Sequence, residues 1–151
     1  MRVEESVVID APRPQIFDYA TEPTNIRRFF RAITRWEPDG PKRHGLGARY
    51  KTRIRLGSAE VGSFVEVVEY ERPGDMAWAS ITGLEQRGRF IIRDAGGGRT
   101  KVSLRLSYQA PGGVLALMAD LVSGQLMKPV LRDALAQLKE QIENQVEDVG
   151  A

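Results

Sequence analysis

Residues 6–19 read SVVIDAPRPQIFDY, and this stretch joins a strand directly to a helix. Its first part is rich in β-branched residues, which predicts a strand that runs from Val3 to Asp10. Pro12 and Pro14 lack an N–H group and have a fixed φ, so they suit the first turn of a helix better than its interior. We therefore expect a short helix that begins beside these prolines and continues through Ala20.

A second short helix is expected immediately after the first. Thr21 precedes Glu22-Pro23 and is the expected N-terminal cap. Apolar residues then recur at i, i+3, i+4 and i+7, the spacing of one helix face. They are Ile26, Phe29, Phe30 and Ile33.

From Gly47 to Gln109 the apolar pattern has a period of two, which is typical of strands with one buried face. Five strands joined by short turns predict an antiparallel meander, with Gly96-Gly97-Gly98 as a hairpin turn. The alternation leaves open which face the residues from Met76 to Thr82 present. The residues expected to point inward are Tyr50, Thr52, Ile54, Leu56, Val61, Ser63, Val65, Val67, Phe90, Ile92, Val102, Leu104, Leu106 and Tyr108.

After residues 111–113 the period returns to that of a helix and remains so nearly to the end of the chain. A continuous helix over 113–147 would be ~50 Å long at about 1.5 Å per residue. This length exceeds the diameter of roughly 40 Å expected for a domain of this size. Pro129 cannot donate to the carbonyl four residues back, so it is expected to kink or divide the helix.

This order of elements predicts an α+β fold in which a curved antiparallel sheet wraps around a long C-terminal helix. Glycines at 57, 62, 83 and 88 fit the bends that wrapping requires. A curved sheet and a straight helix match poorly, so packing tends to leave a gap between them. That gap is the candidate ligand site.

Several segments resemble the START-like helix-grip superfamily (SRPBCC), and most closely its polyketide cyclase/dehydrase and lipid-transport branch. Residues 6–19 resemble the opening strand and the Ala-Pro helix start of that superfamily, and Phe29-Phe30 stands where relatives carry aromatic residues. Residues 98–102, GRTKV, resemble the turn into the last strand, and residues 135–143, LAQLKEQIE, resemble the closing helix. The resemblance implies one helix-grip domain over 1–151 with a cavity for a hydrophobic small molecule.

Composition excludes several kinds of chemistry. The 151 residues include no Cys and one His, so Cys/His metal sites, Cys-dependent catalysis and disulfides are excluded, and we expect neither a metal nor a cofactor. No apolar run approaches the ~20 residues that cross a bilayer, and the first residues lack the pattern of a signal peptide. We expect a cytoplasmic protein that is a monomer or a homodimer.

Charge is distributed unevenly along the chain. Residues 13–55 carry eleven basic and four acidic groups, a net +7, whereas the whole chain carries +2. Phe29 and Phe30 do not alternate with the basic strand residues as a base-stacking platform would, so no nucleic-acid partner is expected. The basic 13–55 surface leaves open a role in contact with a membrane surface or an acidic protein.

The expected ligand contacts come from the inward faces and from the start of the C-terminal helix. They are Tyr50, Thr52, Ser63, Trp78, Phe90, Leu104, Leu106, Tyr108 and Met118, with Ser80 and Gln86 as further candidates. His44 is interpreted as a solvated loop residue and Glu66 as an outward-facing one, each with an acid/base role as the alternative.

These observations favour binding or transport of a hydrophobic molecule that is lipid-like, quinone-like or polyketide-like. One alternative is a cyclase or dehydratase that works without a metal, in which Tyr, Ser and Arg groups orient a carbonyl substrate. The other alternative is a protein-interaction or membrane-interaction module that uses the basic 13–55 surface. We assign no catalytic residue from the sequence.

Overall fold

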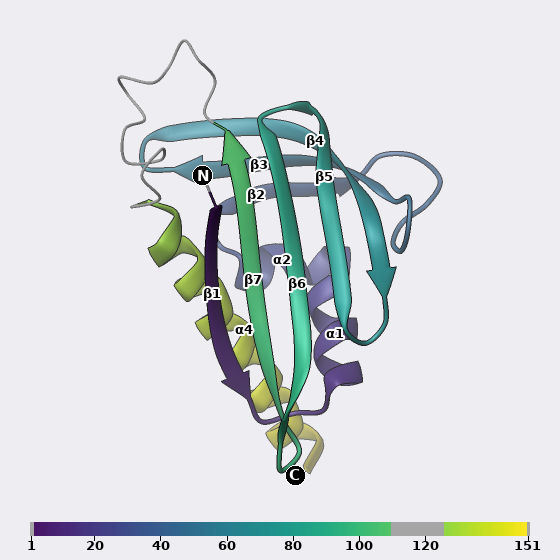
Figure 1. The fold of residues 1–151 in the computed structure, drawn as a ribbon, viewed down its shortest axis with the longest axis vertical. Coiled ribbons are helices and arrows are strands. Elements are labelled where there is room, and N and C mark those ends of the chain that lie inside the picture. Colours follow the sequence, from purple (N-terminus) through teal and green to yellow (C-terminus); the bar gives the residue numbers. More distant parts are fainter. Residues whose placement is uncertain (1, 110–125, 151) are drawn as a thin grey trace.

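The computed structural model describes residues 2–109 and 126–150, and it confirms the predicted helix-grip arrangement. Seven antiparallel strands form one sheet in the order β1-β7-β6-β5-β4-β3-β2, with the helices on one side of it (Figure 1). The elements are β1 (Arg2–Ile9), α1 (Arg13–Thr21), α2 (Pro23–Phe29), β2 (Ile33–Pro38), β3 (Arg49–Leu56), β4 (Ala59–Glu71), β5 (Asp75–Gly83), β6 (Glu85–Gly96), β7 (Arg99–Gln109) and α4 (Met127–Gly150).

The strand-to-helix stretch folds as predicted, except for the cap between the two short helices. Pro12 is the N-terminal cap of α1. Thr21 is the last residue of α1 and donates its hydroxyl to the carbonyl of Phe17, so it does not cap α2 as predicted. Glu22 takes that role and accepts a hydrogen bond from the backbone N–H of Thr24.

The second helix is shorter than the apolar spacing predicts. It ends at Phe29, and Ile33 begins β2, a strand that the helical spacing conceals. Ile33 pairs with Ile54 of β3, and its side chain is buried by sheet packing. An apolar residue seven positions after another can therefore be buried because it lies in a following strand, and not only because both lie on one face of a helix.

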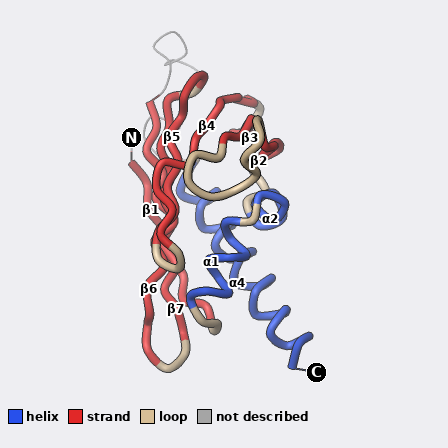
Figure 2. Tube along the Cα trace, turned by 90° about the vertical axis from the view of Figure 1, so that its right-hand side faces the viewer, coloured by secondary structure: helices blue, strands red, loops and turns tan. Residues whose placement is uncertain are grey.

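The sheet curls around the helices. Figure 2 shows β1, β6 and β7 as a wall beside the helices, and β2, β3 and β4 bending over them. Two register shifts between β4 and β5 leave Ile81 of β5 and Val68 of β4 unpaired, and such β-bulges bend and twist a strand. This curvature brings the inner faces of β2 and β3 opposite that of β7.

The C-terminal helix buries one stripe against the sheet, but Pro129 does not kink it. Helix α4 begins at Met127, so Pro129 lies in the first turn, where its missing N–H removes no helical hydrogen bond. The part of the predicted helix that falls in residues 110–125 lies outside the described residues. The buried stripe of α4 consists of Met127, Leu131, Ala134, Leu135, Leu138 and Ile142.

Polar contacts hold α4 to the two short helices. Tyr19 donates its hydroxyl to Gln141 Oε1 at 2.6 Å, and Gln141 Nε2 donates to the carbonyl of Arg28 at 2.9 Å. Arg31 forms an ion pair with Asp133. Over the described ranges, no helix is long and apolar enough to cross a membrane.

Candidate functional site

A small cavity lies where the inner faces of β2, β3, β5, β6 and β7 meet the end of α2. Its volume is about 20 Å³, which is room for about one water molecule. Among the described residues, side chains thus leave little free space at this point of the sheet, and no α4 residue lines the cavity, unlike the gap predicted beside the C-terminal helix. The cavity is lined by Phe30, Ile33, Trp36, Thr52, Arg53, Ile54, Trp78, Gln86 and Leu106.

Two tryptophans dominate the wall of this cavity. The rings of Trp36 and Trp78 pack edge to face with centroids 5.6 Å apart, and Trp36 also stacks on Tyr50 at 5.1 Å. Both indoles are at least 95% buried. Neither Nε1–H has a hydrogen-bond acceptor among the described residues. A buried donor without an acceptor costs about 1–3 kcal/mol, and two of the residues that line the cavity carry such a donor.

The position of Trp78 depends on a glycine in the next strand. Trp78 of β5 pairs with Gly88 of β6, and the indole lies across the space that a side chain at Gly88 would occupy. A Cβ added there would lie 2.0 Å from Cζ2 of the ring. A glycine at position 88 therefore makes room for the indole of Trp78, a role beyond the strand bending predicted from sequence.

A chain of hydrogen bonds forms the polar side of the cavity. Thr52 Oγ1 donates to the carbonyl of Ser63 at 3.0 Å, which leaves the Ser63 hydroxyl to donate to Thr52 Oγ1 at 2.8 Å. Gln86 Nε2 donates to Ser63 Oγ, also at 2.8 Å. Ser80 Oγ accepts the backbone N–H of Gln86. Thr52, Ser63 and Gln86 therefore form a satisfied polar network on three strands.

The two predicted tyrosines are buried and protonated at neutral pH. Tyr50 donates its hydroxyl to the carbonyl of Arg43, and burial raises the pKa of Tyr50 to about 12. Burial also raises the pKa of Tyr108, which lies beside Gln86 at a separate hollow. Each phenol is therefore protonated at neutral pH and not suited to act as a base, and the hydroxyl proton of Tyr50 is already donated to Arg43.

The remaining predicted ligand contacts fall in different places. Trp78 and Leu106 line the cavity together with Thr52, whereas Phe90 and Leu104 lie in the surrounding core. Phe90 packs at 6.0 Å from Trp78 and at 6.2 Å from Phe29. Met118 lies outside the described residues. Trp36, Ile33 and Phe30 are cavity residues that the predicted ligand contacts omit, because the sequence pattern conceals β2.

An open groove of about 700 Å³ adjoins the cavity, between α2 and β2. Ile33 and Trp36 line both the groove and the cavity, so they form the wall between them. Other apolar groove residues are Pro23 and Pro38. Of the residues that the structure describes, four arginines and no acidic side chain line the groove. They are Arg27, Arg28, Arg31 and Arg43.

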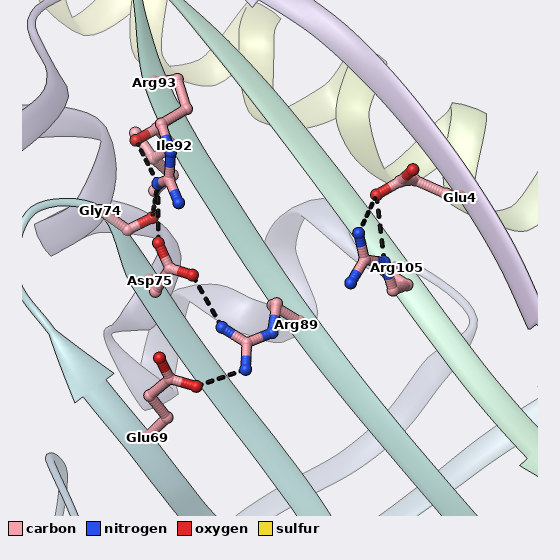
Figure 3. Close-up of polar contacts among 8 residues, drawn as sticks. All are labelled: Glu4, Glu69, Gly74, Asp75, Arg89, Ile92, Arg93 and Arg105. Atoms are coloured by element: carbon pink, nitrogen blue, oxygen red, sulfur yellow. Dashed lines mark hydrogen bonds and ion pairs between the residues drawn. The ribbon is translucent and has the colours of Figure 1, made fainter.

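Several arginines on the outer face of the sheet have carboxylate partners. Figure 3 shows Arg89 between Glu69 and Asp75, and Arg105 beside Glu4. Burial raises the pKa of Asp75, but hydrogen bonds from Arg93 and Arg89 outweigh it and hold that pKa below its usual value. Glu69, Asp75, Arg89 and Arg93 thus form one surface network of ion pairs.

Two further candidates lie on the outside of the protein. His44 is exposed in the loop between β2 and β3, as predicted. Glu66 forms an ion pair with Arg49 at 3.0 Å and points away from the cavity, also as predicted. Within residues 2–109 and 126–150, no group of three His, Asp or Glu side chains could hold a metal ion.

Solved structures of other proteins share this fold over almost the whole chain. TTHA0849 from Thermus thermophilus has a TM-score of 0.81 at 19% identity, covering 96% of this chain and 99% of that one. The Zhui aromatase/cyclase from Streptomyces sp. R1128 has a TM-score of 0.75 at 14% identity, covering 97% and 95%. A START superfamily protein from Mycobacterium smegmatis has a TM-score of 0.71 at 16% identity, covering 93% and 98%.

Sequence comparison identifies the family. Among curated proteins none matches the chain significantly. A family model described as polyketide cyclase / dehydrase and lipid transport matches residues 1–143, which confirms the resemblance seen in residues 6–19 and 98–102. The family and the fold support hydrophobic-ligand binding or a cyclase-type function. The chain belongs to the polyketide cyclase/dehydrase and lipid-transport family.

Proposed function

We propose that the protein binds a hydrophobic ring compound with carbonyl oxygens, of the quinone-like or polyketide-like class, at the cavity between the inner face of the sheet and the end of α2. The observation that carries the proposal is the pair of buried indole N–H groups at one cavity, on Trp36 and Trp78. An indole can only donate a hydrogen bond, and a carbonyl oxygen is the acceptor that an otherwise apolar ligand can supply. Trp36, Trp78 and Leu106 would contact its rings.

Such a ligand is larger than the 20 Å³ cavity, so binding requires part of the wall to move. Ile33 and Trp36 separate the cavity from the open groove, and displacement of these two side chains would join the two spaces. On the opposite wall of the cavity, Thr52, Ser63 and Gln86 are joined by hydrogen bonds, and this wall need not move when a ligand enters. Entry of a ligand from the groove therefore requires movement of side chains on β2 and leaves the hydrogen-bond network on β3, β4 and β6 in place.

Cyclase-type catalysis is the second candidate function, and the protonation of Tyr50 and Tyr108 bears on it. A phenol with a raised pKa donates a hydrogen bond to a carbonyl and so can polarise it, but it does not remove a proton at neutral pH. Turnover of an aromatic polyketide precursor that is lost in Tyr108→Phe would support this function. Binding without turnover supports the carrier function.

The test compares two ligands of the same shape, 2-methyl-1,4-naphthoquinone and 2-methylnaphthalene, by calorimetric titration. We expect the quinone to bind more tightly than the hydrocarbon. Trp78→Phe keeps an aromatic ring and removes one donor, so it should weaken quinone binding about fivefold, since one neutral hydrogen bond contributes about 1 kcal/mol. Hydrocarbon binding should change little in that variant. If neither compound binds, nor any member of a lipid and polyketide panel, the proposed function is wrong.

A further inference from the structure

The groove between α2 and β2 is cationic, and neighbouring carboxylates offset only part of its charge. Its four arginines come from three places in the chain: Arg27 and Arg28 from the last turn of α2, Arg31 from the connection to β2, and Arg43 from the following loop. No described acidic residue lines the groove. Ion pairs account for the positions of Arg31 and Arg43, so the like charges that need a reason other than stability are those of Arg27 and Arg28.

Only two of the four arginines have a carboxylate partner among the described residues. Arg31 pairs with Asp133, and Arg43 pairs with Glu22, whose pKa is held below its usual value by that hydrogen bond. Arg27 and Arg28 are exposed, and no described carboxylate lies within 4.0 Å of either guanidinium. On the outer sheet face Arg89 and Arg105 are paired (Figure 3), but the exposed Arg55 and Arg87 of that face also have no described carboxylate within 4.0 Å. What distinguishes Arg27 and Arg28 is that they line a groove with an apolar floor.

Helix stabilisation explains only part of this arrangement. Cations in the last turn of a helix interact favourably with its dipole, and Arg27 and Arg28 occupy that turn of α2. The helix has 7 residues, so its dipole is small and the effect is exposed to solvent. Arg31 and Arg43 lie beyond the helix, and dipole stabilisation gives no reason for them to face the same groove.

We propose that this groove binds the acidic group, a carboxylate or a phosphate, of an amphipathic ligand, with Arg27 and Arg28 as the binding residues. Guanidinium groups match the geometry of carboxylate and phosphate oxygens. The inference rests on the proposed function and adds the ligand's chemical class. The floor of the groove is Ile33 and Trp36, which is also the wall of the cavity, so a ligand held by its acid at α2 has its apolar rings directed to the two indoles.

The test uses anthraquinone-2-carboxylate and its neutral carboxamide, which share the same rings and ketone groups. Wild-type protein should bind the carboxylate about tenfold more tightly than the carboxamide, a difference that shrinks as salt is added. Arg27→Gln/Arg28→Gln should remove that preference and leave carboxamide binding unchanged. Unchanged carboxamide binding also shows that the variant is folded. The matched control is Arg55→Gln/Arg99→Gln, which removes the same charge from exposed positions on β3 and at the start of β7.

The outcomes separate this inference from the proposed function. If both compounds bind equally and the Arg27/Arg28 variant changes neither, the acidic-group site is wrong and the proposed function stands. If the control variant loses the preference as fully as the groove variant, the effect is general charge and the site is also wrong. Inorganic phosphate that binds as tightly as the carboxylate would show a site for a free anion, which contradicts the amphipathic ligand. If neither ring compound binds, both proposals fail.

Discussion

Substitution of Gly88 by alanine tests how the indole of Trp78 is seated. The added Cβ would lie 2.0, 2.2 and 2.5 Å from Cζ2, Cε2 and Cη2 of the ring. Carbon atoms in contact lie about 3.5 Å apart, so the ring must retreat by roughly 1.5 Å. Its retreat is opposed by Trp36 at 5.6 Å and Phe90 at 6.0 Å between ring centroids. Overpacking of this kind costs about 1–3 kcal/mol, and we expect a loss near 2 kcal/mol in the free energy of unfolding.

The assay is urea unfolding, with Gly62→Ala as the matched control. Gly62 lies in β4 with an ordinary strand conformation, and a Cβ there would meet only the carbonyl of Thr52 at 3.5 Å. That variant should be unchanged or up to about 1 kcal/mol more stable, because alanine restricts the unfolded chain. Gly88→Ala should also shift the tryptophan emission. Equal stability of the two variants would refute the packing of Trp78 over Gly88.

Three more predictions concern the core, the polar network and the surface. Leu138→Ala removes a side chain of α4 that is 0% exposed and should cost about 2–5 kcal/mol in urea unfolding; a loss below 1 kcal/mol would contradict its burial. Thr52→Val removes both hydrogen bonds to Ser63 and should cost about 1–2 kcal/mol by the same assay, with an unchanged stability as the contrary result. Hydrogen bonds from Arg72 lower the pKa of Asp18 below 3.8, so this pair stabilises the fold above about pH 4 and ceases to do so as pH falls through the lowered pKa. The stability difference between wild type and Asp18→Asn should thus be constant above pH 5 and shrink toward pH 2, and a difference that is independent of pH would contradict the pairing.

Elements with a long, regular pattern were predictable from sequence. The alternation of Tyr50, Thr52, Ile54 and Leu56 matches the buried positions of β3, because one face of a strand is either in the core or out of it. The strand β2 was not predictable in the same way. Its first residue, Ile33, continues a helical spacing, and the strand has only six residues. Because β2 carries Trp36, missing this strand also left Trp36 out of the predicted ligand contacts.

The candidate site was harder to predict than the fold, because it depends on contacts between distant elements. Thr52, Ser63 and Gln86 come together only through the order of the strands. The role of Gly88 is invisible until Trp78 is seen beside it. Pro129 would kink a helix if it lay in the interior, but it is favourable in the first turn. Which case applies depends on where α4 begins, and the sequence pattern does not fix that residue.

The most direct test of the proposed function is the indole ¹H–¹⁵N spectrum during titration with 2-methyl-1,4-naphthoquinone. The chain has two tryptophans, and both line the cavity, so each indole signal reports on the site. We expect at least one Nε1–H signal of Trp36 and Trp78 to shift downfield, with saturation, as a carbonyl oxygen accepts its hydrogen bond. Titration with 2-methylnaphthalene should produce no such shift. Two indole signals that stay in place while the quinone binds would contradict it.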